Sequence, residues 1–224
     1  MVDFKKMMSK EYQEEYEKIK QEREEQERIE EEIRNQSAHF TGHRPNNKYM
    51  FGYDLKHPGY KPIIEKITEI AEMVINKEGI TRFLTRGALG IDTISFWCIH
   101  KLKEKYPHIK NIVVVPFKNQ PIKWNENDKK WYRKMLKMAD EVIYVDELEG
   151  YEVKDIPVGE YHVAKMDLGN KYMVKNTKIT IGYFDGSKGG TANCMRDANK
   201  IGRMIIRIDP RYNYELDIRY GIRY

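Results

Sequence analysis

Apolar and polar positions alternate with two different periods along most of the chain after residue 36. Short apolar runs have the pattern of strands, and the stretches between them repeat their apolar residues at helical spacing. The continuous run "NIVVV" is typical of a strand buried on both faces. The predicted strands are residues 37–42, 80–87, 109–117, 141–146, 178–184 and 203–209, and the predicted helices are residues 61–76, 91–106, 128–138, 161–175 and 191–201.

Strands that alternate with helices favour parallel pairing through right-handed crossovers. The pattern therefore predicts an α/β fold, a Rossmann-like doubly wound and mainly parallel sheet with helices on both faces. Residues 146–170 are acidic and punctuated by glycine, and we expect them to form a flap over the ligand cleft. Residues 207–224 alternate Arg and Asp with Tyr and Ile, which predicts an edge strand or a crossing to a partner subunit.

The N-terminal region has a pattern of its own. Residues 11–34 contain neither Gly nor Pro, and Met8, Tyr12, Tyr16 and Ile19 recur at helical spacing, which predicts one long charged helix. This helix could project into solvent, pack on a second subunit through its tyrosines, or dock on its own domain. We therefore divide the chain into a helical extension, residues 1–36, and a nucleotide-binding domain, residues 37–224.

The net charge of +5 conceals an asymmetry. Residues 1–36 carry twelve acidic and eight basic side chains, so the remainder has a balance of +9, which favours polyanions or phosphorylated small molecules as partners. Cys98 and Cys194 have neither metal-like nor disulfide-like spacing, which fits a reducing cytoplasm. We expect no metal and no cofactor. No apolar stretch reaches the roughly 18 residues that span a bilayer, so we expect no membrane association.

Glycine-bearing loops follow the first, second and fifth predicted strands: "FTGHRPNN", "TRGALGID" and "FDGSKGGTAN". Ligands of open α/β sheets bind beyond the carboxyl ends of the strands, and a helix N-terminus there offers unpaired N–H groups to a phosphate. Each loop alone could be only a tight turn, but three on one edge favour an anion cradle. The predicted ligand-binding residues are Thr41, Gly42, His43, Arg44, Arg86, Gly87, Gly90, Asp92, Asn170, Asp185, Lys188, Gly189, Gly190 and Thr191.

The third loop has the most direct phosphate chemistry. Gly189 and Gly190 would let the backbone approach an anion closely, and Lys188 would add charge. Thr191 could cap the following helix or donate its hydroxyl.

The other charged candidates each have a structural alternative. His43 could be an acid or base or only a hydrogen-bonding loop residue, and Arg44 could contact phosphate or ribose. Arg86 could point into the cleft as a phosphate clamp or away to pair with an acid. Asp92 could accept from a ribose hydroxyl or serve as a favourable charge at a helix N-terminus.

Aromatic residues follow the third predicted strand. Trp124, Trp131 and Tyr132 have the spacing of core residues, although one of them could stack on a purine from the rim of the cleft.

Four motifs, "FTGHRP", "GALGID", "VVVPF" followed by Trp, and "DGSKGGT", together resemble the SLOG superfamily, specifically its YpsA-like branch, over about residues 37–208. The resemblance implies a Rossmann-like domain that binds a nucleotide or a nucleotide-derived ligand. Relatives include LOG-type phosphoribohydrolases, which release a base from a nucleoside monophosphate, the DNA-processing protein DprA, and SLOG sensor domains that bind nucleotide signals in antiviral systems.

The chain departs from this family pattern at three places. Where LOG-type enzymes carry a catalytic Glu, this chain has Cys194, and Asp197 lies one helical turn further on. Where YpsA-like relatives tend to have a second Gly, the chain has Arg86. Where they carry an Arg-Asn pair, it has Gly169 and Asn170.

Four hypotheses for the function follow. The protein could bind a nucleotide-derived signal, such as a cyclic ADP-ribose product, to sense or sequester it, including in phage defence or anti-defence. It could be a LOG-like N-glycosidase that uses Arg44, Asp92 or Asp197. It could bind single-stranded nucleic acid as DprA does, since tyrosines alternate with arginines near the C-terminus. It could be a structural partner, and we expect a homo-oligomer formed through the N-terminal helix or the C-terminal segment. The Cys at position 194 favours binding over catalysis.

Overall fold

The computed structural model describes residues 10–221. Its centre is a seven-stranded sheet in the order β4-β3-β2-β1-β5-β6-β7. The first six strands are parallel, and β7 is an antiparallel edge strand beside β6. The strands are β1 Ser37–Gly42, β2 Arg82–Thr85, β3 Lys110–Val115, β4 Glu141–Tyr144, β5 Ile179–Tyr183, β6 Met204–Asp209 and β7 Glu215–Tyr220.

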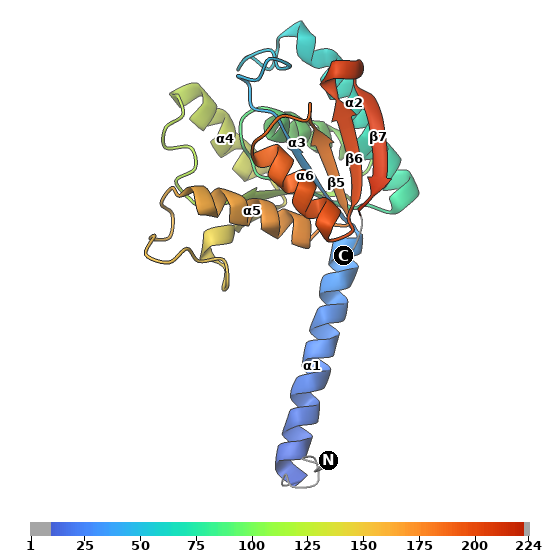
Figure 1. Ribbon diagram of the computed structural model, residues 1–224, viewed down its shortest axis with the longest axis vertical. Coiled ribbons are helices and arrows are strands. Elements are labelled where there is room, and N and C mark those ends of the chain that lie inside the picture. The colour runs from blue at the N-terminus through green and yellow to red at the C-terminus, as the bar shows by residue number, and fades with distance from the viewer. Residues whose placement is uncertain (1–9, 222–224) are drawn as a thin grey trace.

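Helices cover both faces of the sheet (Figure 1). Neighbouring residues of β2 show the two layers, because Phe83 packs in the cluster that holds α2 and α3, whereas Leu84 packs against Met173 of α5. The sheet and its two helical layers confirm the predicted Rossmann-like fold. The helices are α1 Lys10–Asn35, α2 Lys61–Glu78, α3 Ile91–Leu102, α4 Glu126–Met138, α5 Val163–Lys175 and α6 Gly190–Lys200.

The strand order reverses next to β1. From β1 the chain builds β2, β3 and β4 outward on one side, and it then returns through α5 to place β5 on the other side of β1. Gly42 and Tyr183, the last residues of β1 and β5, pair with each other. The fold therefore has a topological switch point at these two strand ends, which is where ligands of such sheets bind.

The long helix α1 projects from the edge of the sheet where β1 begins (Figure 1). Ion pairs one helical turn apart, such as Arg23–Glu27 at 3.0 Å, run along it. Tyr12, Tyr16 and Ile19 are more than half exposed. The predicted helix is confirmed over the described residues, whereas docking of this helix on its own domain is wrong. Met8 lies outside the described residues.

The segment before α5 differs from the prediction. Instead of a flap over the switch point, residues 147–162 pack beside α5 and the end of β3. Tyr151 meets Tyr172 of α5 edge to face, Asn119 N–H donates to Gly159 O, and Tyr161 meets Phe117 edge to face. The Lys165 ammonium, buried in α5, pairs with Asp146 at 2.8 Å and fixes this arrangement. The flap was mispredicted because this buried pair leaves no hydrophobic pattern in the sequence.

Candidate functional site

The loops after β1 and β5 are joined to each other at the switch point. Asp185 N–H donates to His43 Nε2 at 3.2 Å, and both side chains are buried. Burial lowers the pKa of His43, although the Asp185 carboxylate opposes the effect. A neutral imidazole that accepts a backbone hydrogen bond joins the two loops. This favours the interpretation of His43 as a hydrogen-bonding loop residue over an acid or base. At Gly42, a Cβ would stand 2.7 Å from Ile91, so only glycine lets α3 begin this close to β1.

The loop after β2 closes tightly on the loop after β1. Gly90 has φ +97°, and a Cβ there would lie 2.3 Å from His43 O. Gly87 also has a left-handed conformation, with φ +63°. Asp92 Oδ1 accepts the backbone N–H of Arg86 at 2.9 Å, so this carboxylate holds the turn in shape.

Arg86 carries a buried guanidinium. The residue is only 6% exposed, and it forms no ion pair within residues 10–221. Its Nη1 donates to Met166 O over 3.4 Å, and its Nε is buried without a hydrogen-bond partner in the described chain. The side chain passes Gly169 of α5, where a Cβ would lie 3.8 Å from Arg86 Cδ. The predicted alternative of an acidic partner is therefore not seen among the described residues.

The loop after β5 leads into α6 and exposes backbone N–H groups. Asp185 Oδ1 accepts from Ser187 N at 2.9 Å, which forms a turn, and Gly189 has φ +146° as the N-cap residue of α6. No side chain caps this helix. A Cβ on Gly190 would meet only Asn170 Nδ2, at 4.0 Å. The start of α6 therefore has free donors and open space above them.

Three further predicted residues border this loop. Lys188 is exposed, and Thr191 is half-buried and does not cap α6, so that part of its prediction is wrong. Asn170 comes from α5, where its Nδ2 donates to Gly190 O at 3.4 Å and its buried Oδ1 has no partner in the described chain.

Arg44 follows His43 and adds a second cation. Burial lowers the pKa of Arg44, Asp92 opposes the effect, and the charge of Arg86 adds to it. Arg44 forms no ion pair within the described residues. We call these three loops, with Arg44, Arg86 and Asn170, the strand-tip site. Its net charge is positive, because Arg44, Arg86 and Lys188 outnumber the carboxylates Asp92 and Asp185.

A buried thiol and imidazole lie beneath the strand-tip site, and the sequence reading missed them as a pair. Cys194 Sγ is 3.4 Å from His39 Nε2. The Thr177 hydroxyl donates its proton to Met173 O, so its oxygen accepts from His39 Nδ1–H at 2.7 Å. With the proton on Nδ1, His39 Nε2 accepts from the Cys194 thiol. The signal in the sequence was a histidine inside an apolar strand, which alone does not reveal its partner.

Both members of this pair are uncharged. Burial raises the pKa of the Cys194 thiol to about 12 and lowers the pKa of His39 to about 3. The charge of Arg86 lowers both pKa values, which shows that the guanidinium lies close to them. A thiol in this state is inert.

The remaining sequence candidates have other surroundings, although the Tyr132 ring lies beside Gly87 of the strand-tip site. Asp197 is seven positions beyond Gly190 on α6, with its carboxylate 3.7 Å from Arg196. Tyr132 packs in the core beside β3, as the core alternative predicted, and Trp124 packs against it. No group of three possible metal-ligating side chains occurs among residues 10–221.

The chain belongs to the YspA SLOG family, whose sequence profile matches residues 38–203. This places the three loops and both arginines within the family's domain and leaves α1 outside it. The protein resembles an SPbeta prophage-derived protein of Bacillus subtilis, YoqJ, with 44% identity over 170 residues. That match covers 75% of this chain and 99% of YoqJ.

More distant relatives are UPF0398 proteins. The one from Halalkalibacterium halodurans is 28% identical over 153 residues, which covers 67% of this chain and 73% of the relative. The one from Staphylococcus haemolyticus is 28% identical over 141 residues, covering 63% and 67% of the two chains. Within the part of the chain that the structure describes, no helix is long and apolar enough to cross a membrane.

Proposed function

We propose that the strand-tip site binds the phosphate of a nucleotide or a nucleotide-derived signalling molecule. The observation that carries the proposal is Arg86, a residue that is 6% exposed and whose buried Nε has no hydrogen-bond partner among the described residues. An uncompensated buried cation is costly, so such a group is best explained by an anion that arrives from outside. Arginine also matches phosphate oxygens with two parallel donors.

The start of α6 supports the same ligand. Its first N–H groups have no side-chain cap, and a helix N-terminus favours negative charge. Asn170 links the two halves of the site, because it follows Gly169, which lies beside the Arg86 side chain, and its Nδ2 donates to Gly190 O. A phosphate above Gly190 would lie between the helix N-terminus and the guanidinium.

The same residues favour binding over turnover. One oxygen of Asp92 is already engaged by the Arg86 backbone, and Cys194 and His39 are locked to each other in uncharged forms. The thiol and the imidazole are therefore not set to transfer a proton near neutral pH. We therefore infer that the protein senses or sequesters its ligand. The prophage origin in the name of the similar protein YoqJ supports a role in phage defence or anti-defence.

Thermal unfolding with a panel of nucleotides, cyclic dinucleotides and ADP-ribose derivatives tests this proposal. A ligand at 100 times its Kd stabilises the folded protein by about 2.7 kcal/mol. We expect this stabilisation in the wild type and its loss in Gly190→Val, whose side chain would fill the open space above Gly190. Arg86→Met should also lose it, whereas the matched change Arg196→Met, on an exposed part of α6, should keep it.

Two results would contradict the proposal. One is a Gly190→Val protein that is stabilised by ligand as strongly as the wild type, since the loop would then be only a turn. The other is release of free base from a nucleoside monophosphate, followed by chromatography, which would establish the N-glycosidase alternative.

A further inference from the structure

The strand β7 forms one outer edge of the sheet. Within residues 10–221 it pairs with β6 on one side, and no strand lies on its other side. All its residues except Leu216 are exposed, including the apolar Ile218 at 46% and Tyr220 at 72%. The strand contains neither Pro nor Lys, which proteins commonly use to keep such an edge from pairing. β7 therefore offers an open edge to a further strand.

The register of β7 on β6 determines which of its backbone groups point outward. Gly221 N donates to Arg203 O at 2.9 Å, and the antiparallel register continues from there along the whole of β7. Backbone groups of successive residues point to opposite sides of a strand, so the odd-numbered residues of β7 bond toward β6 as Gly221 does. The N–H and C=O groups of Leu216, Ile218 and Tyr220 therefore point outward, where a second antiparallel strand can bond to them.

The side chains of β7 are sorted between the two faces of the sheet. Leu216, Ile218 and Tyr220 share one face, and Leu216 packs there on the core cluster that holds α2. Asp217 and Arg219 share the other face, where their side chains pair at 2.9 Å and both remain about half exposed. Two opposite charges therefore stand on either side of Ile218.

This order of charges makes β7 complementary to a second copy of itself. When two β7 strands run antiparallel about a two-fold axis at Ile218, Asp217 of each strand stands opposite Arg219 of the other, and Leu216 stands opposite Tyr220. An axis at Asp217 or at Arg219 would instead place like charges opposite each other, which is unfavourable. The register centred on Ile218 also brings together the outward-pointing backbone groups. Charge and hydrogen bonding thus select the same register.

We propose that two copies of the protein pair through β7 in this register and join their sheets into one continuous sheet. Each copy contributes the same strand, so the contact is isologous and closes as a dimer. Main-chain bonds at Leu216, Ile218 and Tyr220 hold the two strands together. The cross-strand pairs between Asp217 and Arg219 fix the register. The strand lies outside residues 38–203, the part of the chain that the family profile matches.

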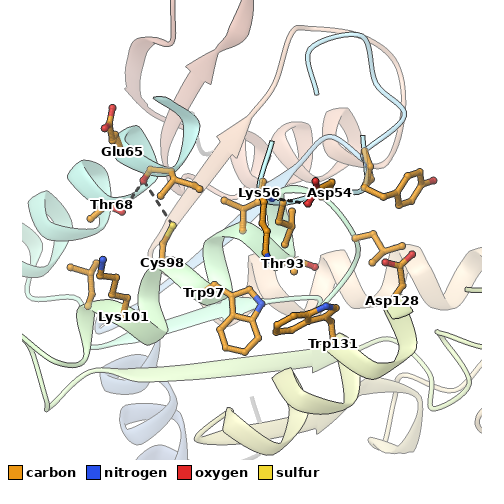
Figure 2. Close-up of a pocket in the computed structure, with 18 of the residues that line it drawn as sticks. Asp54, Lys56, Glu65, Thr68, Thr93, Trp97, Cys98, Lys101, Asp128 and Trp131 are labelled. Carbon is orange, nitrogen blue, oxygen red and sulfur yellow. Dashed lines mark hydrogen bonds between the residues drawn. The ribbon is translucent and has the colours of Figure 1, made fainter. Parts of the chain in front are cut away.

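This contact leaves the other surfaces of the molecule open. A cavity of about 1200 Å³ lies beside α3, between α2 and α4, where Trp97 and Trp131 meet edge to face (Figure 2). None of its lining residues belongs to β6 or β7. The strand-tip site also includes no residue of β7. Each subunit of the dimer therefore keeps a complete strand-tip site and an accessible cavity.

Sedimentation velocity of the full-length protein over a concentration series tests the pairing, and the wild type should dimerise. Asp217→Arg would place two arginines opposite each other and Arg219→Asp two aspartates, so each change should weaken association by more than about tenfold. In a mixture of the two variants every cross-strand pair again has opposite charges, so heterodimers should form. Both positions are about half exposed, so each variant should keep the thermal midpoint of the wild type. Arg196→Asp, an exposed charge reversal on α6, is the matched control and should dimerise normally.

Cysteine cross-linking tests the register. Opposed residues of a hydrogen-bonded antiparallel pair have Cα atoms about 5.5 Å apart, within the range that a disulfide spans. Ile218→Cys should therefore give a covalent dimer on oxidation, because this residue faces itself. Tyr220→Cys should not, because it faces Leu216, although Tyr220 is the more exposed of the two. Cys98 and Cys194 are buried, so the wild type should stay free of cross-links.

Three results would each overturn the proposal. They are a wild type that stays monomeric at every concentration, a mixture of the two charge variants that stays monomeric, and equal cross-linking from positions 218 and 220.

Discussion

Arg86 is the residue whose burial the protein's own contacts do not explain. The glycine at position 169 leaves the space through which its side chain passes, and the loop geometry that holds its backbone comes from Asp92. The sequence indicated an arginine at a strand end but left two directions open for its side chain. The packing of α5 beside the Arg86 side chain decides that direction, and no local sequence pattern reports it.

The unliganded protein should gain stability when this cation is removed. Arg86→Met keeps much of the side-chain volume and removes an unsatisfied buried donor group, so the free energy of unfolding should rise by roughly 1–3 kcal/mol. Urea unfolding without ligand measures the change. A fall in stability would mean that the guanidinium has a structural role in the folded chain, and would remove the main support for an anion site.

His39 makes stability depend on pH. Its folded pKa of about 3 lies below the ordinary value of 6.5, so the unfolded chain takes up a proton in a range where the folded chain does not. The free energy of unfolding should therefore fall as pH is lowered from 6.5 toward 3, by up to about 1.4 kcal/mol per pH unit from this group. His39→Gln should have a smaller slope in urea titrations across this range. An identical slope in both proteins would show that His39 is protonated within the folded core.

At the scale of elements, the strands and helices of the sheet domain followed from their periodicity, because two-sided burial demands continuous Val and Ile runs. The glycine loops after β1, β2 and β5 were also predictable, since Gly42, Gly90 and Gly190 stand where a side chain would collide or fill the site. The position of residues 147–162, before α5, was not predictable, because it depends on the buried ion pair between Lys165 and Asp146. Likewise, His39 and Cys194 are 155 residues apart, and only the packing of α6 on β1 brings them together.

The buried pair between Lys165 and Asp146 should therefore be essential to this segment. Lys165 Nζ also donates to Pro157 O, and Asp146 Oδ2 accepts from Gly159 N, so the backbone around residues 157–159 depends on the pair. Asp146→Ala should lower the free energy of unfolding by about 3–5 kcal/mol, because it leaves a buried ammonium without its anion.

A matched surface pair provides the control for this change. Asp167→Ala breaks the exposed pair with Lys171 and should cost about 1 kcal/mol or less. The double change Asp146→Leu with Lys165→Met should recover much of the loss. Equal small effects for the buried and the exposed pair in urea unfolding would show that the segment is held by its other contacts.

At the scale of the whole molecule, the chain combines a family domain with an added arm. The family profile ends before β6, and 170 residues of this chain match 99% of YoqJ, so the protein has more than that relative's full length. The helical spacing of apolar residues predicted that this arm, α1, is a helix. The cavity beside α3 could not be predicted, because it forms only through the arrangement of α2, α3 and α4 in space.

The loop between β1 and α2 belongs both to the strand-tip site and to the wall of a cavity of about 1200 Å³ beside α3. Arg44 is in the strand-tip site, and the next residue, Pro45, lines the cavity, as does Tyr53 further along the same loop. An anion that draws Arg44 toward itself would therefore pull on the wall of the cavity. We expect saturating ligand to change the protection of the backbone amides of residues 46–55, which hydrogen exchange with and without ligand would measure. Unchanged protection would show that the two surfaces are independent. Because such coupling is reciprocal, whatever fills the cavity would change how firmly the protein holds its anion.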